Sequence, residues 1–332
     1  MFVPLSIPSP SADWQYFDLT SWINSTFGAS LSGSLRIHAY AICILVGIVV
    51  AGIITNQRLR ARGAENGVVI DVMLFCVPLG IVGGRFFHVV THPADYFDGQ
   101  AFWHVFAVWE GGLAIYGALL VGAVGVWLGC RATGLRFSVF ADSLAPGLLV
   151  AQAFGRLGNY FNHELFGTPT DLPWGLEIEQ TNAAWPTGLP AGTLFHPTFL
   201  YEIIWMLAGV AVLLLIERRR PLQWGTALAF YLIWYGVGRS VFESIRTDPS
   251  LLFLGIRTNV WMSFAAIVLG LVIALVASRR HTGRVPGAYV PGRSPAERHS
   301  EVDSADTYTE DDEPELVTVG SSDDKTETTP RS

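Results

Sequence analysis

Seven stretches of about 20 mainly apolar residues constrain this chain more than any other feature. A bilayer core about 30 Å thick is crossed by an α-helix of about that length. The stretches cover about 37–55, 67–90, 107–130, 137–155, 198–216, 224–242 and 260–278. Only 15% of the residues are charged, against roughly 25% in an average soluble protein. The sequence therefore predicts an all-α integral membrane protein with seven transmembrane helices.

Arginines predict the sidedness of these helices. Ten of them follow the first, third, fifth and seventh stretches: Arg58, Arg60, Arg62, Arg131, Arg136, Arg218, Arg219, Arg220, Arg279 and Arg280. If the helices alternate in direction, all ten fall on one side, and the positive-inside rule makes that side cytoplasmic. We expect an extracytoplasmic N-terminus, a cytoplasmic C-terminus and an extracytoplasmic polar loop at about 158–197. No removable signal peptide is visible.

The remaining segments divide the chain into three parts. Residues 1–35 form a predicted extracytoplasmic arm and residues 36–280 the seven-helix domain. Residues 281–332 are rich in Ser, Thr, Pro, Asp and Glu, a composition typical of a disordered tail. From Ser300 onward there are 11 acidic and 2 basic residues, so the rest of the chain has 17 acidic and 19 basic residues. The net charge of −7 therefore belongs to a cytoplasmic tail.

Charged side chains inside the apolar stretches indicate a functional site, because each costs roughly 2.5–3.5 kcal/mol at the bilayer centre. In the sixth stretch, Tyr235, Arg239, Glu243 and Arg246 follow one helical face. A structural ion pair needs one arginine, whereas here two arginines share one carboxylate. The surplus positive charge favours an anion site over a purely structural pairing.

Two further clusters lie at the outer ends of predicted helices. The run GRLGNYFNHELFG (155–167) contains Arg156, Asn159 and Glu164. Arginine offers a planar fork of donors to phosphate oxygens, so this run indicates a phospholipid headgroup site, with a structural Arg–Glu network as the alternative. The run HPTFLYE (196–202) contains His196, typical of a cap or surface residue, and Glu202, one turn inside the membrane.

With these residues the sequence resembles the bacterial prolipoprotein diacylglyceryl transferase family. The 155–167 run resembles the family's most specific motif, and the likeness covers about residues 30–280. Other matches occur in the family's order: Tyr40, Gly84-Arg85, Trp109-Glu110-Gly111-Gly112-Leu113, Pro173-Trp174-Gly175, the 196–202 run, and Tyr235-Gly236 with Arg239, Glu243 and Arg246.

The resemblance implies an enzyme of the bacterial inner membrane, acting on its extracytoplasmic side. Such an enzyme moves the sn-1,2-diacylglyceryl group of phosphatidylglycerol to the lipobox cysteine of a prolipoprotein and releases glycerol-1-phosphate. It implies that the lipid is bound by Arg156 and Asn159, with Arg85 and Gly167 as further binding residues. Arg239 is assigned to the phosphate or leaving group. The remaining catalytic candidates are Tyr40, Glu164, Tyr235, Glu243, Arg246, His196 and Glu202.

One departure from the family concerns the proposed base. Well-known members carry a histidine where this chain has Tyr116, within Ala114-Ile115-Tyr116-Gly117-Ala118. A tyrosine has a reference pKa of about 10, against about 6.5 for histidine, so it is a poor base near neutral pH. Either another group accepts the thiol proton, or this position is not an obligatory base, and we favour the second interpretation. His196, Glu202 and the lipid phosphate are the alternative acceptors.

Partners and rival functions follow from the same residues. We expect phosphatidylglycerol, lipobox-containing prolipoproteins and membrane lipids as partners, with no metal, cofactor or nucleic acid. A transporter with an outward-facing arginine-lined cavity is the main rival from another class. Another membrane-embedded lipid transferase is a nearer rival, but it should lack the 155–167 motif. A structural scaffold explains none of the clusters.

Overall fold

The computed structural model describes residues 6–30, 32–97, 102–108, 111–248, 252–281, 283, 285–295 and 297. Its long helices are α2 (Ala39–Arg60), α3 (Val68–Thr91), α5 (Ile115–Thr133), α6 (Phe137–Phe161), α7 (Thr198–Arg219), α8 (Thr226–Ile245) and α9 (Thr258–Arg280). Short helical segments are η1 (Ala12–Trp14), α1 (Leu19–Phe27), α4 (Ala94–Phe97) and η2 (Phe102–Phe106). The protein is therefore mostly helical, as the sequence predicts.

Within the described residues, six helices are long and apolar enough to cross a membrane, namely α2, α3, α5, α6, α7 and α9. The sixth predicted span, at about 224–242, corresponds to α8, which has 20 residues but includes Arg239 and Glu243. The predicted third span begins too early, because α5 begins only at Ile115. Gly111 and Gly112 have φ angles of 91° and 73°, a backbone conformation that cannot continue a right-handed helix.

Glycines allow the helices to pack closely in pairs. Helix α3 packs mainly on α5, and α2 mainly on α6. A Cβ atom added at Gly83 would lie 2.5 Å from the carbonyl oxygen of Gly117, so these two backbones touch. At Gly147 an added Cβ would lie 3.0 Å from the carbonyl oxygen of Ala51. Small residues are the usual interface between membrane helices, and these contacts set the separation within each pair.

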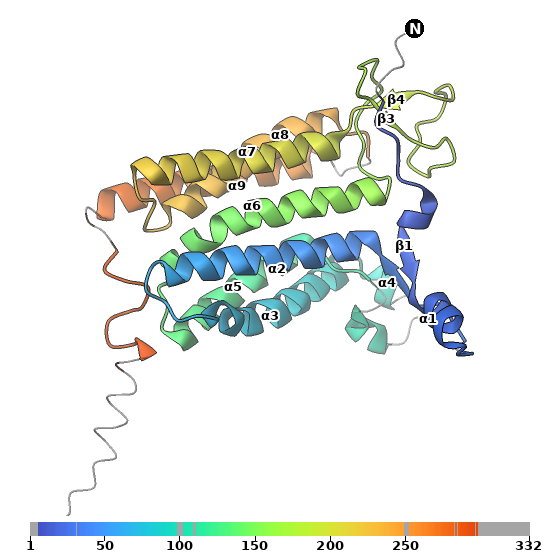
Figure 1. Ribbon diagram of the computed structural model, residues 1–332. Helices are drawn as coiled ribbons and strands as arrows, with labels where there is room; N and C mark the ends of the chain where they lie inside the picture. Colours follow the sequence, from blue (N-terminus) through green and yellow to red (C-terminus); the bar gives the residue numbers. More distant parts are fainter. Residues whose placement is uncertain are drawn as a thin grey trace, which may run out of the picture.

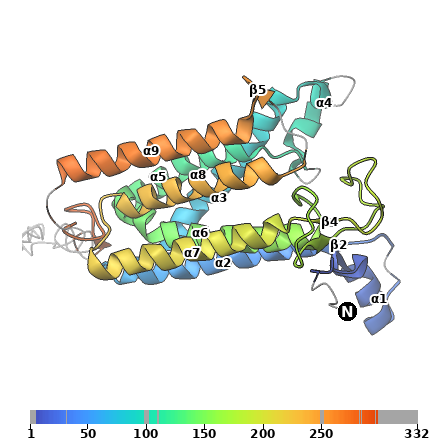
Figure 2. The ribbon, with the colours of Figure 1, turned by 90° about the horizontal axis from the view of Figure 1, so that it is seen from above.

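The bundle has two different ends (Figure 1). We call the end that carries α1, α4 and the strands the arm end, and the opposite end, where residues 285–295 lie, the tail end. Three antiparallel two-stranded sheets lie at the arm end: β1 (Tyr16–Asp18) with β2 (Arg36–His38), β3 (Leu176–Glu177) with β4 (Leu194–Phe195), and β5 (Leu252–Phe253) with β6 (Ile256–Arg257). Figure 2 shows α7 and α9 on opposite sides of the bundle, and α8 contacts both.

Polar contacts hold the tail end of α8 in place. The carboxylate of Asp142 on α6 accepts hydrogen bonds from the backbone N–H groups of Gly225, Ala227 and Leu228, at 2.8–3.2 Å. These groups lack partners within the helix, and a carboxylate at a helix N-terminus is favourable. These hydrogen bonds therefore hold the tail-end start of α8 against α6.

Part of the expected disordered tail is packed against the bundle. Tyr289 forms a β-bridge with Leu135, and the Arg136 N–H donates to the carbonyl oxygen of Ala288 at 2.8 Å. Ala288 is 2% exposed and belongs to a core cluster with residues of α2, α3 and α6. Residues 285–295 are therefore ordered, because their few apolar side chains are buried. The rest of the predicted tail, from residue 298 onward, lies outside the described residues.

Candidate active site

One half of the candidate site lies where the arm ends of α6 and α7 meet. The Nε atom of Arg156 on α6 lies 2.7 Å from Oε2 of Glu202 on α7, and these side chains are 18% and 2% exposed. Arg156 NH1 donates to Asn159 Oδ1 at 3.1 Å, and Asn159 Nδ2 donates to Glu164 Oε1 at 2.7 Å. The pairing with Glu202 offsets part of the cost of removing the Arg156 charge from water.

The backbone after α6 returns Glu164 to the end of that helix. Residues His163 and Leu165 have φ angles of 53° and 59°, in the left-handed region that non-glycine residues rarely adopt. The Glu164 N–H donates to the carbonyl oxygen of Asn159 at 3.2 Å. Glu164 therefore reaches Asn159 through a turn. On the neighbouring face, a Cβ at Gly158 would lie 2.7 Å from the ring of Tyr40, so this glycine lets α2 approach the site.

The other half of the site is built on the arm end of α8. The NH2 atom of Arg239 lies 2.9 Å from Glu243 Oε2, with the Glu243 side chain fully buried. The second oxygen, Oε1, accepts from Arg257 NH1 at 3.1 Å and from Asn259 Nδ2 at 2.9 Å. The hydroxyl of Tyr116 on α5 donates to Asn259 Oδ1 at 2.8 Å. One carboxylate therefore pairs with a cation on α8 and accepts hydrogen bonds from β6 and α9, and the amide of Asn259 connects it to α5.

The predicted pairing of Arg246 with Glu243 is wrong. Helix α8 ends at Ile245, and Arg246 has an extended backbone that forms a β-bridge with Gly167. The Arg246 side chain pairs instead with Asp248, with Nε and Oδ1 2.7 Å apart. Burial raises the pKa of Asp248, but the hydrogen bond and charge of Arg246 outweigh it, so that pKa lies below its usual value. The second arginine on Glu243 is Arg257, which the helical spacing could not reveal.

The two halves face one another through their arginines. Arg156 lies within electrostatic range of Tyr235, Arg239 and Arg246. The NH1 atom of Arg239 is buried and has no hydrogen-bond partner among the residues that the structure describes. Buried polar atoms are nearly always hydrogen-bonded. This guanidinium edge is therefore suited to an acceptor oxygen supplied by a ligand, and a phosphate oxygen would match its charge.

Three predicted site residues have other roles in the structure. Arg85 donates to the backbone carbonyl oxygens of His104, Val105, Gly111 and Gly112, with Val105 at 2.9 Å, and so holds these two segments together. The Nδ1 atom of His196 lies 3.2 Å from the hydroxyl oxygen of Tyr201. A Cβ at Gly167 would lie 2.8 Å from that of His196, which explains the glycine by packing. Trp109 and Glu110 lie outside the described residues.

Sequence reasoning missed Arg257 and Asn259. Both lie where β6 becomes α9, in a stretch that the sequence assigned only to the extracytoplasmic side. A charged residue directly before a long apolar helix was the available signal. It did not indicate a partner, because β5 and β6 form a hairpin that turns this segment towards Glu243, and that turn leaves little trace in hydropathy.

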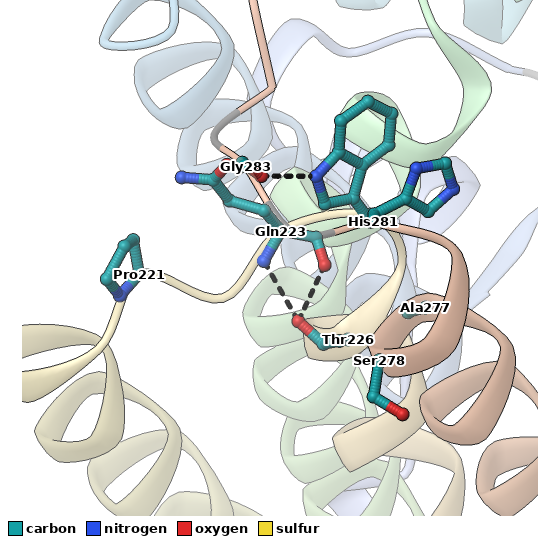
Figure 3. A pocket seen from close by; sticks show the side chains of 8 residues that line it. Pro221, Gln223, Thr226, Ala277, Ser278, His281 and Gly283 are labelled. Carbon is teal, nitrogen blue, oxygen red and sulfur yellow. Dashed lines mark hydrogen bonds between the residues drawn. The ribbon is translucent and has the colours of Figure 1, made fainter.

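The hollow drawn in Figure 3 lies at the tail end, away from these residues. There the ring of Trp224 stacks on that of His281 with centroids 3.9 Å apart, and its Nε1 donates to the carbonyl oxygen of Gly283 at 2.9 Å. No group of three or more His, Cys, Asp or Glu side chains able to hold a metal ion occurs among the described residues. The candidate site is thus built from arginines, carboxylates, amides and tyrosines.

These features define a multi-pass helical membrane protein with a buried arginine site near one end of its bundle. The family model for prolipoprotein diacylglyceryl transferase matches residues 28–276. A phosphatidylglycerol–prolipoprotein diacylglyceryl transferase of Leifsonia xyli is 57% identical over 92% of this chain and 91% of its own length. The enzyme of the same name in Paenarthrobacter aurescens is 44% identical over 77% of this chain and 83% of its own length. The chain belongs to the prolipoprotein diacylglyceryl transferase family.

Proposed function

We propose that this protein transfers the diacylglyceryl group of phosphatidylglycerol to the lipobox cysteine of prolipoproteins. The cysteine sulfur attacks the C3 carbon of the lipid glycerol, a thioether forms, and the bond from C3 to the phosphate oxygen breaks. Glycerol-1-phosphate leaves with the bonding electrons, and the thiol proton is lost to an acceptor. The observation that carries this proposal is the buried NH1 of Arg239 beside Glu243, which has no hydrogen-bond partner among the described residues.

Each residue of the site has its own role in this reaction. Arg156 binds the lipid phosphate, with Asn159 beside it, and Arg239 neutralises the charge that develops on the departing oxygen. Preorganised donors aimed at developing charge are the strongest electrostatic aid to such a step. Glu243 and Arg257 fix the orientation of Arg239. Nearby guanidinium charges also favour the thiolate form of the incoming cysteine. Glu202, 2.7 Å from Arg156, serves as its counter-ion.

We place the site on the extracytoplasmic side of a bacterial inner membrane. The ten arginines of the predicted cytoplasmic loops lie at or next to the tail-end termini of α2, α5, α6, α7 and α9, which supports this orientation through the positive-inside rule. Helix α8 then completes seven crossings, its charges facing the site. The N-terminal arm is extracytoplasmic and the acidic tail cytoplasmic. Labelling of single cysteines, introduced at about 187 and about 64, with a membrane-impermeant reagent tests this sidedness.

The decisive experiment supplies the purified protein with phosphatidylglycerol labelled in an acyl chain and a lipobox peptide. We expect labelled peptide and an equal amount of released glycerol-1-phosphate, and no product with a peptide whose cysteine is replaced by serine. Label appearing on a different acceptor favours the other lipid transferase. Movement of labelled solute across vesicles without any peptide product favours the transporter. Either of these results would overturn the proposal.

A further inference from the structure

A directional chain of hydrogen bonds links the ion pair of α8 to a tyrosine on α5. Tyr116 donates to the carbonyl oxygen of the Asn259 side chain at 2.8 Å, and the amide nitrogen of Asn259 donates to Glu243 Oε1 at 2.9 Å. Helix α5 packs mainly on α3, whereas α9 packs mainly on α8. The Asn259 side chain therefore joins two helix pairs at the arm end.

The direction of this chain is fixed by Glu243. A carboxylate paired with arginines only accepts hydrogen bonds, and Glu243 pairs with Arg239 through one oxygen and with Arg257 through the other. Asn259 must therefore present its NH2 group to Glu243. Its carbonyl oxygen must then face Tyr116, which is the only one of the two partners with a proton to donate. The orientation of the amide thus follows from charge, although oxygen and nitrogen have nearly the same size.

The consequence concerns the free side of the Tyr116 oxygen. A tyrosine hydroxyl has one proton and can also accept. Because the proton is directed at Asn259, only lone pairs remain for other partners. Tyr116 is half-buried, and Tyr235 and Arg239 lie close enough to act electrostatically on its hydroxyl, so its oxygen belongs to the half of the site that contains Arg239. A group approaching it there must be a donor.

We propose that Asn259 is a positioning residue that holds Tyr116 as a hydrogen-bond acceptor for a neutral donor of the substrate. The donor is an S–H or O–H group, which is present in the acceptor cysteine and in the glycerol headgroup of the lipid. Tyr116 orients this group and removes no proton from it. The inference rests on the proposed function. It differs from a base at this position, since a base must have its lone pair free and then gain a proton.

The first test replaces the acceptor. In Tyr116→Phe we expect kcat/KM to fall roughly tenfold, the effect of one net hydrogen bond, by the same factor at every pH from 6 to 8. A rise in KM for the peptide assigns the donor to the thiol, and a rise in KM for the lipid assigns it to the headgroup. Tyr289→Phe at the tail end, whose hydroxyl oxygen accepts from the Glu65 N–H, is the matched control. An unchanged kcat/KM for both substrates in Tyr116→Phe would refute the acceptor role.

The second test replaces the NH2 group of Asn259 by an oxygen. Asn259→Asp has nearly the same shape but places a second carboxylate against Glu243. When protonated, the introduced carboxyl donates to Glu243 and accepts from Tyr116, as the amide does. We therefore expect kcat/KM relative to wild type to recover at least tenfold as the pH falls from 8 to 5. The charged or titratable groups around this position are Glu243, Arg239, Arg257, Tyr116 and Tyr235.

A control separates this recovery from general effects of pH. Asn56→Asp makes the same change at the tail end, where Asn56 Nδ2 donates to Asn66 Oδ1 at 2.8 Å, and its ratio to wild type should stay flat. A flat ratio for Asn259→Asp as well would overturn the positioning role, because the protonated carboxyl restores both hydrogen bonds that this role requires. Absence of transfer by the wild-type protein would instead refute the proposed function.

Discussion

Arg239→Lys tests the phosphate-handling role most directly, because it keeps the charge and removes the fork. In the structure one edge of the Arg239 guanidinium lies on Glu243 Oε2 at 2.9 Å, and NH1, on the other edge, meets no acceptor in the part of the chain that the structure describes. A lysine ammonium is a point charge that can stay with Glu243 but cannot also present a second, fixed donor. The loss is one charge-assisted hydrogen bond to the departing phosphate.

That loss is worth roughly 1.5–3 kcal/mol, which corresponds to a fall of roughly 10- to 150-fold in kcat/KM. The assay measures labelled peptide at several lipid concentrations in detergent micelles. Arg58→Lys is the matched control, since Arg58 makes a two-pronged pair with Glu217 at 2.6 and 2.9 Å, at the tail end. It should lower the melting temperature at most. Arg239→Lys at the wild-type rate, or an equal fall in Arg58→Lys, would refute the reasoning.

Three further predictions concern packing, charge and the tail. Gly158→Ala should lower kcat/KM at least tenfold, because its Cβ would lie 2.7 Å from a tyrosine ring, whereas at Gly155 nothing lies within 4 Å and Ala should be neutral. Asp248→Asn should lower the melting temperature at pH 7. This difference should vanish as the pH falls below about 3.8, because the lowered pKa stabilises the fold only while the carboxyl is ionised. Truncation after residue 284 should lower the melting temperature in detergent, and truncation after residue 300 should not.

Hydropathy predicts which segments are helical better than it predicts both ends of each helix. The stretches at 137–155 and 198–216 start at the same residues as α6 and α7, and both helices run further at the other end. The stretch at 107–130 fails at its start, since it counts Gly111 and Gly112 as apolar although their backbone has positive φ. Hydropathy measures transfer from water and contains no information about backbone conformation.

The site shows the same division between local and long-range information. Helical spacing predicts the Arg239–Glu243 pair, because both residues lie within α8. The same spacing fails for Arg246, which lies beyond the last helical residue. The Arg156–Glu202 pair joins two helices, so its individual residues could be singled out but their contact could not. Contacts between two helices of the same chain depend on where glycines allow the helices to approach each other.

The contacts of Glu243 explain why this half of the site contains a buried carboxylate. Its two oxygens fix Arg239, Arg257 and Asn259 at once, and the amide passes that orientation on to Tyr116. Replacing Glu243 by an uncharged residue would leave two arginines close together, without their counter-ion and in surroundings of low dielectric constant, where unpaired charge is most costly. It would also allow the side-chain amide of Asn259 to rotate by half a turn, which exchanges the positions of its oxygen and nitrogen. One negative charge therefore orients Arg239, Arg257 and Asn259 and, through Asn259, Tyr116, while Arg239 NH1 stays available for the substrate.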